Sequence, residues 1–112
     1  MMIRVDSHQH FWHLERGDYS FPTPVLKPIY RDYEPADLIP ILDKWQIGKT
    51  VTVQVTETIA ETKFILELAA ASERFAGVVG WVDLTSAEAT VQIDDLERNP
   101  KLRGFRPIIQ SI

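Results

Sequence analysis

Two histidines and an aspartate, separated by one residue each, lie near the start of the chain. Residues 3–5 have the apolar, β-branched character of a short buried strand, and Asp6, His8 and His10 come at its carboxyl end. If the extended backbone continues, a period of two places the three side chains on one face, with the imidazoles about 6–7 Å apart along the chain. Two neutral imidazoles this close can bind one divalent cation, and an open coordination position beside them can hold an activated water. The alternative for an isolated His-X-His is a pair of loop residues or hydrogen-bonded core residues.

The apolar pattern of the remaining chain predicts alternating helices and strands. The expected helices cover residues 35–46, 62–72 and 87–96, and the expected strands after the first cover 50–55, 75–82 and 104–109. Strands joined by single helices imply right-handed crossovers and a parallel sheet. An open α/β sheet and a (β/α)8 barrel both have this order. The barrel is favoured because no glycine-rich phosphate loop follows any strand.

Helical spacing also predicts which side chains are buried and where the helices end. In the first helix the expected buried face consists of Leu38, Ile41, Leu42 and Trp45. Pro35 suits the first turn of this helix, and Gly48 is expected to cap its end. In the third helix Ala87, Val91 and Leu96 are expected to point toward a core.

The segment 13–34 is rich in Pro, Tyr, Asp and Gly and predicts a long irregular loop. Tyr19, Phe21 and Tyr30 give this loop apolar surface, which favours an ordered lid over the site. Trp12 opens the loop, either as an aromatic anchor in the core or as a direct substrate contact.

Polar side chains stand at or near the carboxyl ends of the later strands, the face where active sites of barrels lie. Gln54 could line a pocket or serve as a hydrogen-bonded strand-end residue, and Asp83 lies just beyond the third strand. Arg106 could anchor an oxyanion or carboxylate, or form a structural ion pair. Glu57 and Glu61 lie before or within the first turn of a helix, where we expect them to act as caps.

The first polar cluster also carries a family resemblance. Asp6-Ser7-His8-Gln9-His10-Phe11-Trp12 resembles the opening of the amidohydrolase superfamily, in the branch of metal-dependent TIM-barrel hydrolases and sugar lactonases of the fuconolactonase or rhamnonolactonase kind. Further matches keep the family's order, namely Arg31-Asp32-Tyr33, Val53-Gln54, Glu61-Thr62, residues 77–84 and Leu102-Arg103-Gly104-Phe105-Arg106.

The resemblance implies hydrolysis of a sugar lactone or related cyclic ester, by attack of activated water on the carbonyl. It implies a divalent metal ion, zinc or manganese, held partly by His8 and His10, and a small-molecule substrate anchored by Arg106. Gln54, Trp12 and Asp83 are further candidates for substrate binding because of their positions at the strand ends and at the start of the loop. Some relatives in the superfamily are decarboxylases, and metal dependence varies among its members. This chain has Pro107 where the family often has histidine, and the family's substrate is therefore a less direct guide to the substrate of this chain.

The chain has 112 residues, whereas a complete barrel needs eight strands and about 250 residues. We therefore expect residues 1–112 to be a partial amidohydrolase-related domain, the N-terminal half of a (β/α)8 barrel truncated after strand four. The resemblance implies that the other metal and catalytic residues come from the missing half. Exposed edge strands would favour association with a second copy or another chain, so a homo-oligomer or a non-catalytic assembly module is an alternative.

Composition narrows the classes of partner. A net charge of −4 with scattered basic residues argues against nucleic-acid binding. No apolar run approaches the roughly 18 residues of a membrane span, and no signal-peptide pattern opens the chain. The absence of cysteine excludes disulfides and thiolate metal sites and fits a cytoplasmic location.

Overall fold

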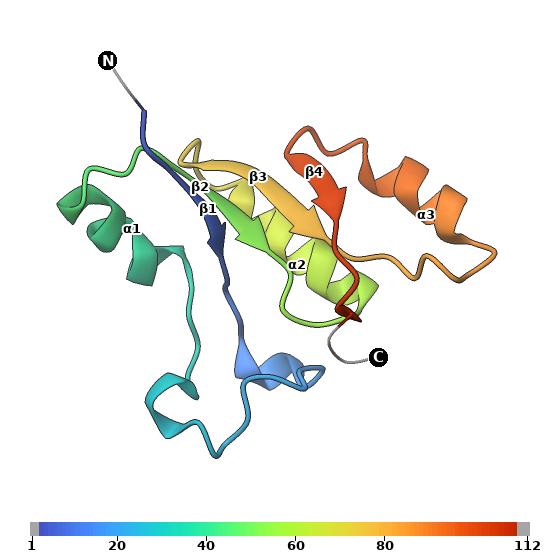
Figure 1. Ribbon diagram of the computed structural model, residues 1–112, viewed down its shortest axis with the longest axis horizontal. Coiled ribbons are helices and arrows are strands. Elements are labelled where there is room, and N and C mark those ends of the chain that lie inside the picture. The colour runs from blue at the N-terminus through green and yellow to red at the C-terminus, as the bar shows by residue number, and fades with distance from the viewer. Residues whose placement is uncertain (1–2, 110–112) are drawn as a thin grey trace.

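The structure, a computed structural model, describes residues 3–109 and is built around one parallel sheet. Figure 1 shows four strands side by side in the order β1-β2-β3-β4, with one helix between each consecutive pair along the chain. The elements are β1 (Val5–Gln9), α1 (Pro35–Lys44), β2 (Lys49–Val53), α2 (Ile59–Ala69), β3 (Phe75–Gly80), α3 (Ala89–Leu96) and β4 (Leu102–Phe105). The predicted alternation of strands and helices is confirmed.

All three strand pairs are parallel, so the four carboxyl ends lie at the same edge of the sheet. The register places Thr52 opposite Val78 and Val79 opposite Gly104. Successive parallel strands joined by helices are also the repeating units of a (β/α)8 barrel, and the predicted α/β fold of four parallel strands with intervening helices is confirmed. Within residues 3–109, β1 and β4 form the two edges of the sheet.

The hydrophobic core lies between α2 and the sheet, where Figure 1 shows α2 crossing one face. Ile65 and Ala69 of α2 pack with Val78 of β3, and all three are buried. The rings of Phe11 and Phe75 meet edge to face with centroids 5.7 Å apart, a favourable arrangement for aromatic pairs. This packing fixes the end of β1 against the rest of the sheet.

The predicted buried face of α1 is only partly buried. Leu42 is inaccessible to solvent, but Ile41 and Trp45 are 53% and 61% exposed, so their predicted burial is wrong for this structure. No element within residues 3–109 covers that part of the helix. A helical apolar pattern predicts the face that prefers burial, whereas actual burial also requires a surface to pack against.

The ends of α1 differ from the prediction at one point. Pro35 begins the helix as predicted, because its missing N–H falls where no helical partner exists. The helix ends with Trp45 as its C-cap, and Gln46 then adopts the left-handed conformation with φ of 56°. The prediction that Gly48 caps the helix is therefore wrong.

The helix predicted over 62–72 begins and ends three residues earlier, at Ile59 and Ala69. Thr58 accounts for the earlier start, since its hydroxyl accepts a hydrogen bond from the backbone N–H of Glu61 at 3.0 Å and caps the first turn. Glu61 is thus not the cap, and its side chain has another partner, described below.

The third helix and the last strand are shorter than predicted. Leu96 is buried as predicted, whereas Val91 is 71% exposed and its predicted place in the core is wrong. The strand predicted over 104–109 starts at Leu102 and ends two residues before Pro107, which has no N–H for the ladder. The three helices are 8 to 11 residues long, and none within residues 3–109 is long and apolar enough to cross a bilayer.

The loop 13–34 is irregular as predicted, except for two short 3-10 turns, η1 (Leu14–Arg16) and η2 (Lys27–Ile29). Figure 1 shows the loop extending beyond the end of β1 before it returns to α1. Backbone hydrogen bonds in both directions between Trp12 and Tyr33 close its base. Its role as a lid stays a prediction.

Replacing Gly80 by alanine is expected to destabilise the protein by about 1–3 kcal/mol, the usual cost of overpacking a core. A Cβ at this position would lie 2.5 Å from Cγ2 of Thr62, whose hydroxyl is hydrogen-bonded to the backbone of Trp81. Gly104→Ala is the matched control, because a Cβ there meets nothing within 4 Å. Urea denaturation measures both variants, and equal midpoints would contradict the prediction.

Candidate functional site

The structure brings His8 and His10 together at the carboxyl end of β1, as their alternate spacing predicts. Their Nε2 atoms lie 3.3 Å apart, and the rings meet edge to face with centroids separated by 4.9 Å. His8 is exposed and His10 is half-buried. The Asp6 carboxylate turns back to the main chain, where Oδ1 accepts a hydrogen bond from the backbone N–H of His8 at 3.1 Å.

A neighbouring strand fixes the orientation of the His10 ring. Its Nδ1 lies 2.8 Å from the backbone carbonyl of Val53, and a carbonyl can only accept, so Nδ1 carries the hydrogen. In the neutral ring Nε2 is then left with its lone pair toward His8. Burial lowers the pKa of His10, the hydrogen bond to Val53 opposes this shift, and the neighbouring His8 and Arg106 add smaller electrostatic contributions that lower it. The neutral, ligand-competent form of the ring is favoured.

The separation of the two imidazoles fits a pair of metal ligands. With zinc–nitrogen bonds of about 2.0–2.1 Å and tetrahedral angles, two nitrogen ligands lie about 3.4 Å apart. The measured Nε2 separation of 3.3 Å is close to this value. Within residues 3–109, however, no three histidine, aspartate or glutamate side chains gather into one potential metal site. Within the described residues, the histidine pair therefore places two imidazole nitrogens, and no third side chain of these types, at the spacing of metal ligands.

Arg106 and Gln54 are joined by two hydrogen bonds at the carboxyl ends of the strands. Nε of Arg106 donates to Oε1 of Gln54 at 2.6 Å, and Nη2 donates to the Gln54 backbone carbonyl at 2.7 Å. The backbone N–H of Arg106 donates to Gly80 at 2.9 Å, which ties the same segment to β3. Gln54 is fully buried, so its side chain holds Arg106 instead of facing solvent. Among the described residues, Nη1 of Arg106 has no acceptor.

Trp12 and Asp83 stand apart from this group. Trp12 is buried, its indole N–H donates to the Arg31 carbonyl at 2.7 Å, and its ring packs against Tyr33. Asp83 is exposed and uses Oδ1 to accept hydrogen bonds from the hydroxyl and backbone N–H of Thr85, which lower the pKa of its carboxyl. In the part of the chain that the structure describes, neither side chain is hydrogen-bonded to the histidine pair or to Arg106.

A buried ion pair near the site is not predicted from the sequence. Glu61 is fully buried and pairs with Arg16 of η1, with 2.6 Å between Oε1 and Nη1. Burial raises the pKa of Glu61, and hydrogen bonds from Val55 and Arg16 oppose that shift. Its position just before the helix expected from the sequence indicates a cap, and no local signal links it to an arginine 45 residues away.

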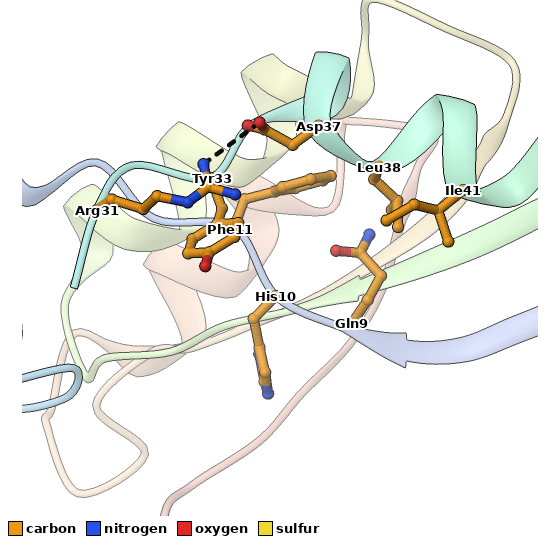
Figure 2. Close-up of a pocket in the computed structure, with 8 residues that line it drawn as sticks. All are labelled: Gln9, His10, Phe11, Arg31, Tyr33, Asp37, Leu38 and Ile41. Atoms are coloured by element: carbon orange, nitrogen blue, oxygen red, sulfur yellow. Dashed lines mark hydrogen bonds and ion pairs between the residues drawn. The ribbon is translucent and has the colours of Figure 1, made fainter. Parts of the chain in front are cut away.

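A small cavity of about 130 Å³ lies between β1 and α1. Figure 2 shows the amide of Gln9 directed toward Leu38 and Ile41 of α1, whereas the ring of His10 points away from them. Arg31 and Asp37 approach each other above this cavity, with 3.4 Å between their charged atoms. The cavity therefore lies on the opposite side of β1 from the histidine ring, and we do not assign the chemistry to it.

Comparisons with known proteins give a consistent result. Residues 5–110 match the sequence model of the amidohydrolase family. The chain is 43% identical over all 112 residues to L-fucono-1,5-lactonase of Burkholderia ambifaria and 39% identical over 109 residues to that of Burkholderia multivorans. It spans 39% and 36% of the lengths of these two proteins.

Solved structures agree with the sequence comparisons. An amidohydrolase from Burkholderia multivorans, crystallised with bound zinc, superimposes with a TM-score of 0.90 at 38% identity. A second crystal form with bound HEPES gives a TM-score of 0.91 at 37% identity. The alignments cover 99% of this chain and 39% and 38% of those chains.

Proposed function

This chain belongs to the amidohydrolase family, and we propose that it is the N-terminal part of an enzyme that hydrolyses a sugar lactone. The observation that carries the proposal is the 43% identity to an L-fucono-1,5-lactonase across all 112 residues. In this reaction water adds to the lactone carbonyl carbon, the bond from that carbon to the ring oxygen breaks, and a sugar acid with a new hydroxyl is formed.

We propose that His8 and His10 provide two ligands for a divalent metal. Their Nε2 separation fits this role, and a relative of similar fold was crystallised with zinc. Of zinc and manganese, imidazole donors suit zinc better, because manganese prefers oxygen ligands. When bound, such a cation would polarise the lactone carbonyl and make water more acidic. The hydrogen bond from Nδ1 to Val53 would orient His10 for the metal, the usual arrangement for a liganding histidine.

The other predicted site residues take distinct roles in this proposal. Arg106 would use Nη1 to bind the lactone oxygen that gains negative charge, while Gln54 holds the remaining nitrogens. Asp83 would accept a hydrogen bond from a sugar hydroxyl through its second oxygen. Trp12 would support the loop wall through its contacts to Arg31 and Tyr33, instead of touching substrate. The proton-transfer residue would come from the part of the protein beyond these four strands.

We further propose that residues 1–112 are one part of a barrel that additional βα units complete. Both edges of the sheet would then be paired, and association of copies would not be needed to cover them. A cytoplasmic location belongs to the same proposal and is supported by a sequence without cysteine.

The isolated chain is expected to lack lactonase activity, because in our proposal it contributes two metal donors while the proton-transfer residue comes from further βα units. The test is a pH-indicator assay of purified 1–112 and of the full-length protein against a panel of aldonolactones. Turnover by the full-length protein, without turnover by residues 1–112, supports the proposal. Turnover by the isolated chain well above the metal-only rate would show that the site is complete without further strands. A full-length protein that hydrolyses none of the lactones would contradict the lactonase proposal.

A further inference from the structure

The Arg16–Glu61 ion pair lies next to the segment that holds both His10 and Arg106. Oε1 of Glu61 accepts from Arg16, and Oε2 accepts from the backbone N–H of Val55 at 2.5 Å. Both carboxylate oxygens are therefore used, and neither faces solvent. A carboxylate buried this completely requires such partners, because its desolvation is otherwise unfavourable.

Arg16 extends the same connection into the loop that follows β1. Its Nη2 donates to Oδ2 of Asp18 at 2.5 Å, and Nη1 also donates to the Tyr19 hydroxyl at 3.1 Å. Asp18 in turn accepts from the Thr58 hydroxyl at 2.7 Å. The guanidinium lies 4.8 Å from the centre of the Phe64 ring, a favourable position for a cation above an aromatic face. The start of the loop is thus tied to the turn between β2 and α2.

Three consecutive residues connect this ion pair to the candidate site. The carbonyl of Val53 accepts a hydrogen bond from the His10 ring, and Gln54 accepts two from Arg106. The N–H of Val55 donates to the carboxylate of Glu61. A shift of Val55 would move the two preceding carbonyls, since planar peptide units leave few soft dihedrals between them. Both groups assigned to the reaction depend on the position of this short segment.

We infer that Glu61, held by Arg16, is a positioning residue that sets the orientation of the His10 imidazole and the Arg106 guanidinium through residues 53–55. The expected effect on catalysis rests on the proposed function. The expected effect on the orientation of His10 and Arg106 rests on geometry alone. Glu61 touches neither substrate nor metal. A contact that only stabilised the fold would leave the site unchanged in folded protein. Loss of the Glu61 carboxylate should instead alter the orientation of His10 and Arg106 in protein that remains folded.

The test is Glu61→Gln in the full-length protein. An amide presents only one acceptor oxygen, so its NH2 group must face either Arg16 or the Val55 N–H. We expect kcat to fall about 10- to 100-fold, the range seen when groups behind metal ligands are replaced, with a smaller change in KM. In metal-free, 15N-histidine-labelled protein, the Nδ1–H signal of His10 should shift or exchange faster with water.

Arg16→Lys is the second variant, because it keeps the charge and loses the planar fork that reaches Asp18 and Glu61 together. It should give the same changes at smaller amplitude, and it decides the question if Glu61→Gln does not fold. Arg74→Met is the matched control at the opposite end of the sheet. Arg74 also forms an ion pair, with Asp43, and donates to two backbone carbonyls, at Ile47 and Gly48.

The control should lower the melting temperature and leave kcat and the His10 signal unchanged. If the Glu61 and Arg16 variants behave like the control, the ion pair is structural and the inference is wrong. The His10 signal is read without substrate or metal. It therefore tests the positioning role even if the full-length protein hydrolyses no lactone, and the two proposals can fail separately.

Discussion

In the full-length protein, replacing both His8 and His10 by alanine is expected to remove the bound divalent metal and to lower kcat/KM on the order of a thousandfold. The reason is that we propose the two Nε2 atoms, which lie 3.3 Å apart, as donors to one cation. Loss of a Lewis acid costs several kcal/mol of transition-state stabilisation, and each 1.4 kcal/mol is about tenfold in rate. Elemental analysis of dialysed protein measures the metal, and lactone hydrolysis measures the rate.

His13→Ala is the matched control for this experiment. His13 is the third histidine of the chain, and it lies 3.3 Å from a carboxylate oxygen of Glu34 and against the ring of Phe64. Its removal should leave metal content and rate near those of the unchanged protein. If the double variant keeps its fold by circular dichroism and binds the same amount of metal, the histidine pair has no ligand role.

The fold could be predicted from the sequence because its main signals are local. Period-two and period-3.6 patterns reflect which side chains share a face, and they identified the strands and helices in the correct order. Burial was predicted less well, as Trp45 and Val91 show, because it depends on what packs against each face. The start of α2 was missed because the Thr58 cap extends the helix beyond its apolar repeat.

The candidate site could be predicted only in part, because contacts between residues far apart in the sequence leave no local signal. The histidine pair was predicted because two residues of one extended segment share a face by covalent geometry. The sequence also predicted Gln54 and Arg106 at strand ends, but it could not show that they bind each other across 52 residues. Parallel strands collect such residues at one edge of the sheet without specifying which of them pair.

Arg106→Lys in the full-length enzyme is expected to lower kcat/KM about tenfold or more, a loss of about 1.4 kcal/mol of transition-state stabilisation. In the structure Nε and Nη2 donate to Gln54, and Nη1 has no acceptor among residues 3–109, so in our proposal one planar group performs both tasks. A lysine ammonium is a single point charge and cannot hold Gln54 and bind a developing oxyanion in the same geometry. The measurements are kcat/KM with the preferred lactone and the melting temperature, on the same preparation.

Arg103→Lys provides the comparison, since it makes the same substitution in β4 at an exposed residue whose side chain lies against Gly77. It should change neither quantity much. The bonds to Gln54 predict some loss of stability for Arg106→Lys, so a lower melting temperature alone does not decide between an anchor and a structural contact. The deciding quantity is the rate per folded molecule. If Arg106→Lys melts several degrees lower while its folded enzyme keeps normal kcat/KM, Arg106 serves the structure alone, and the oxyanion must be bound by another group.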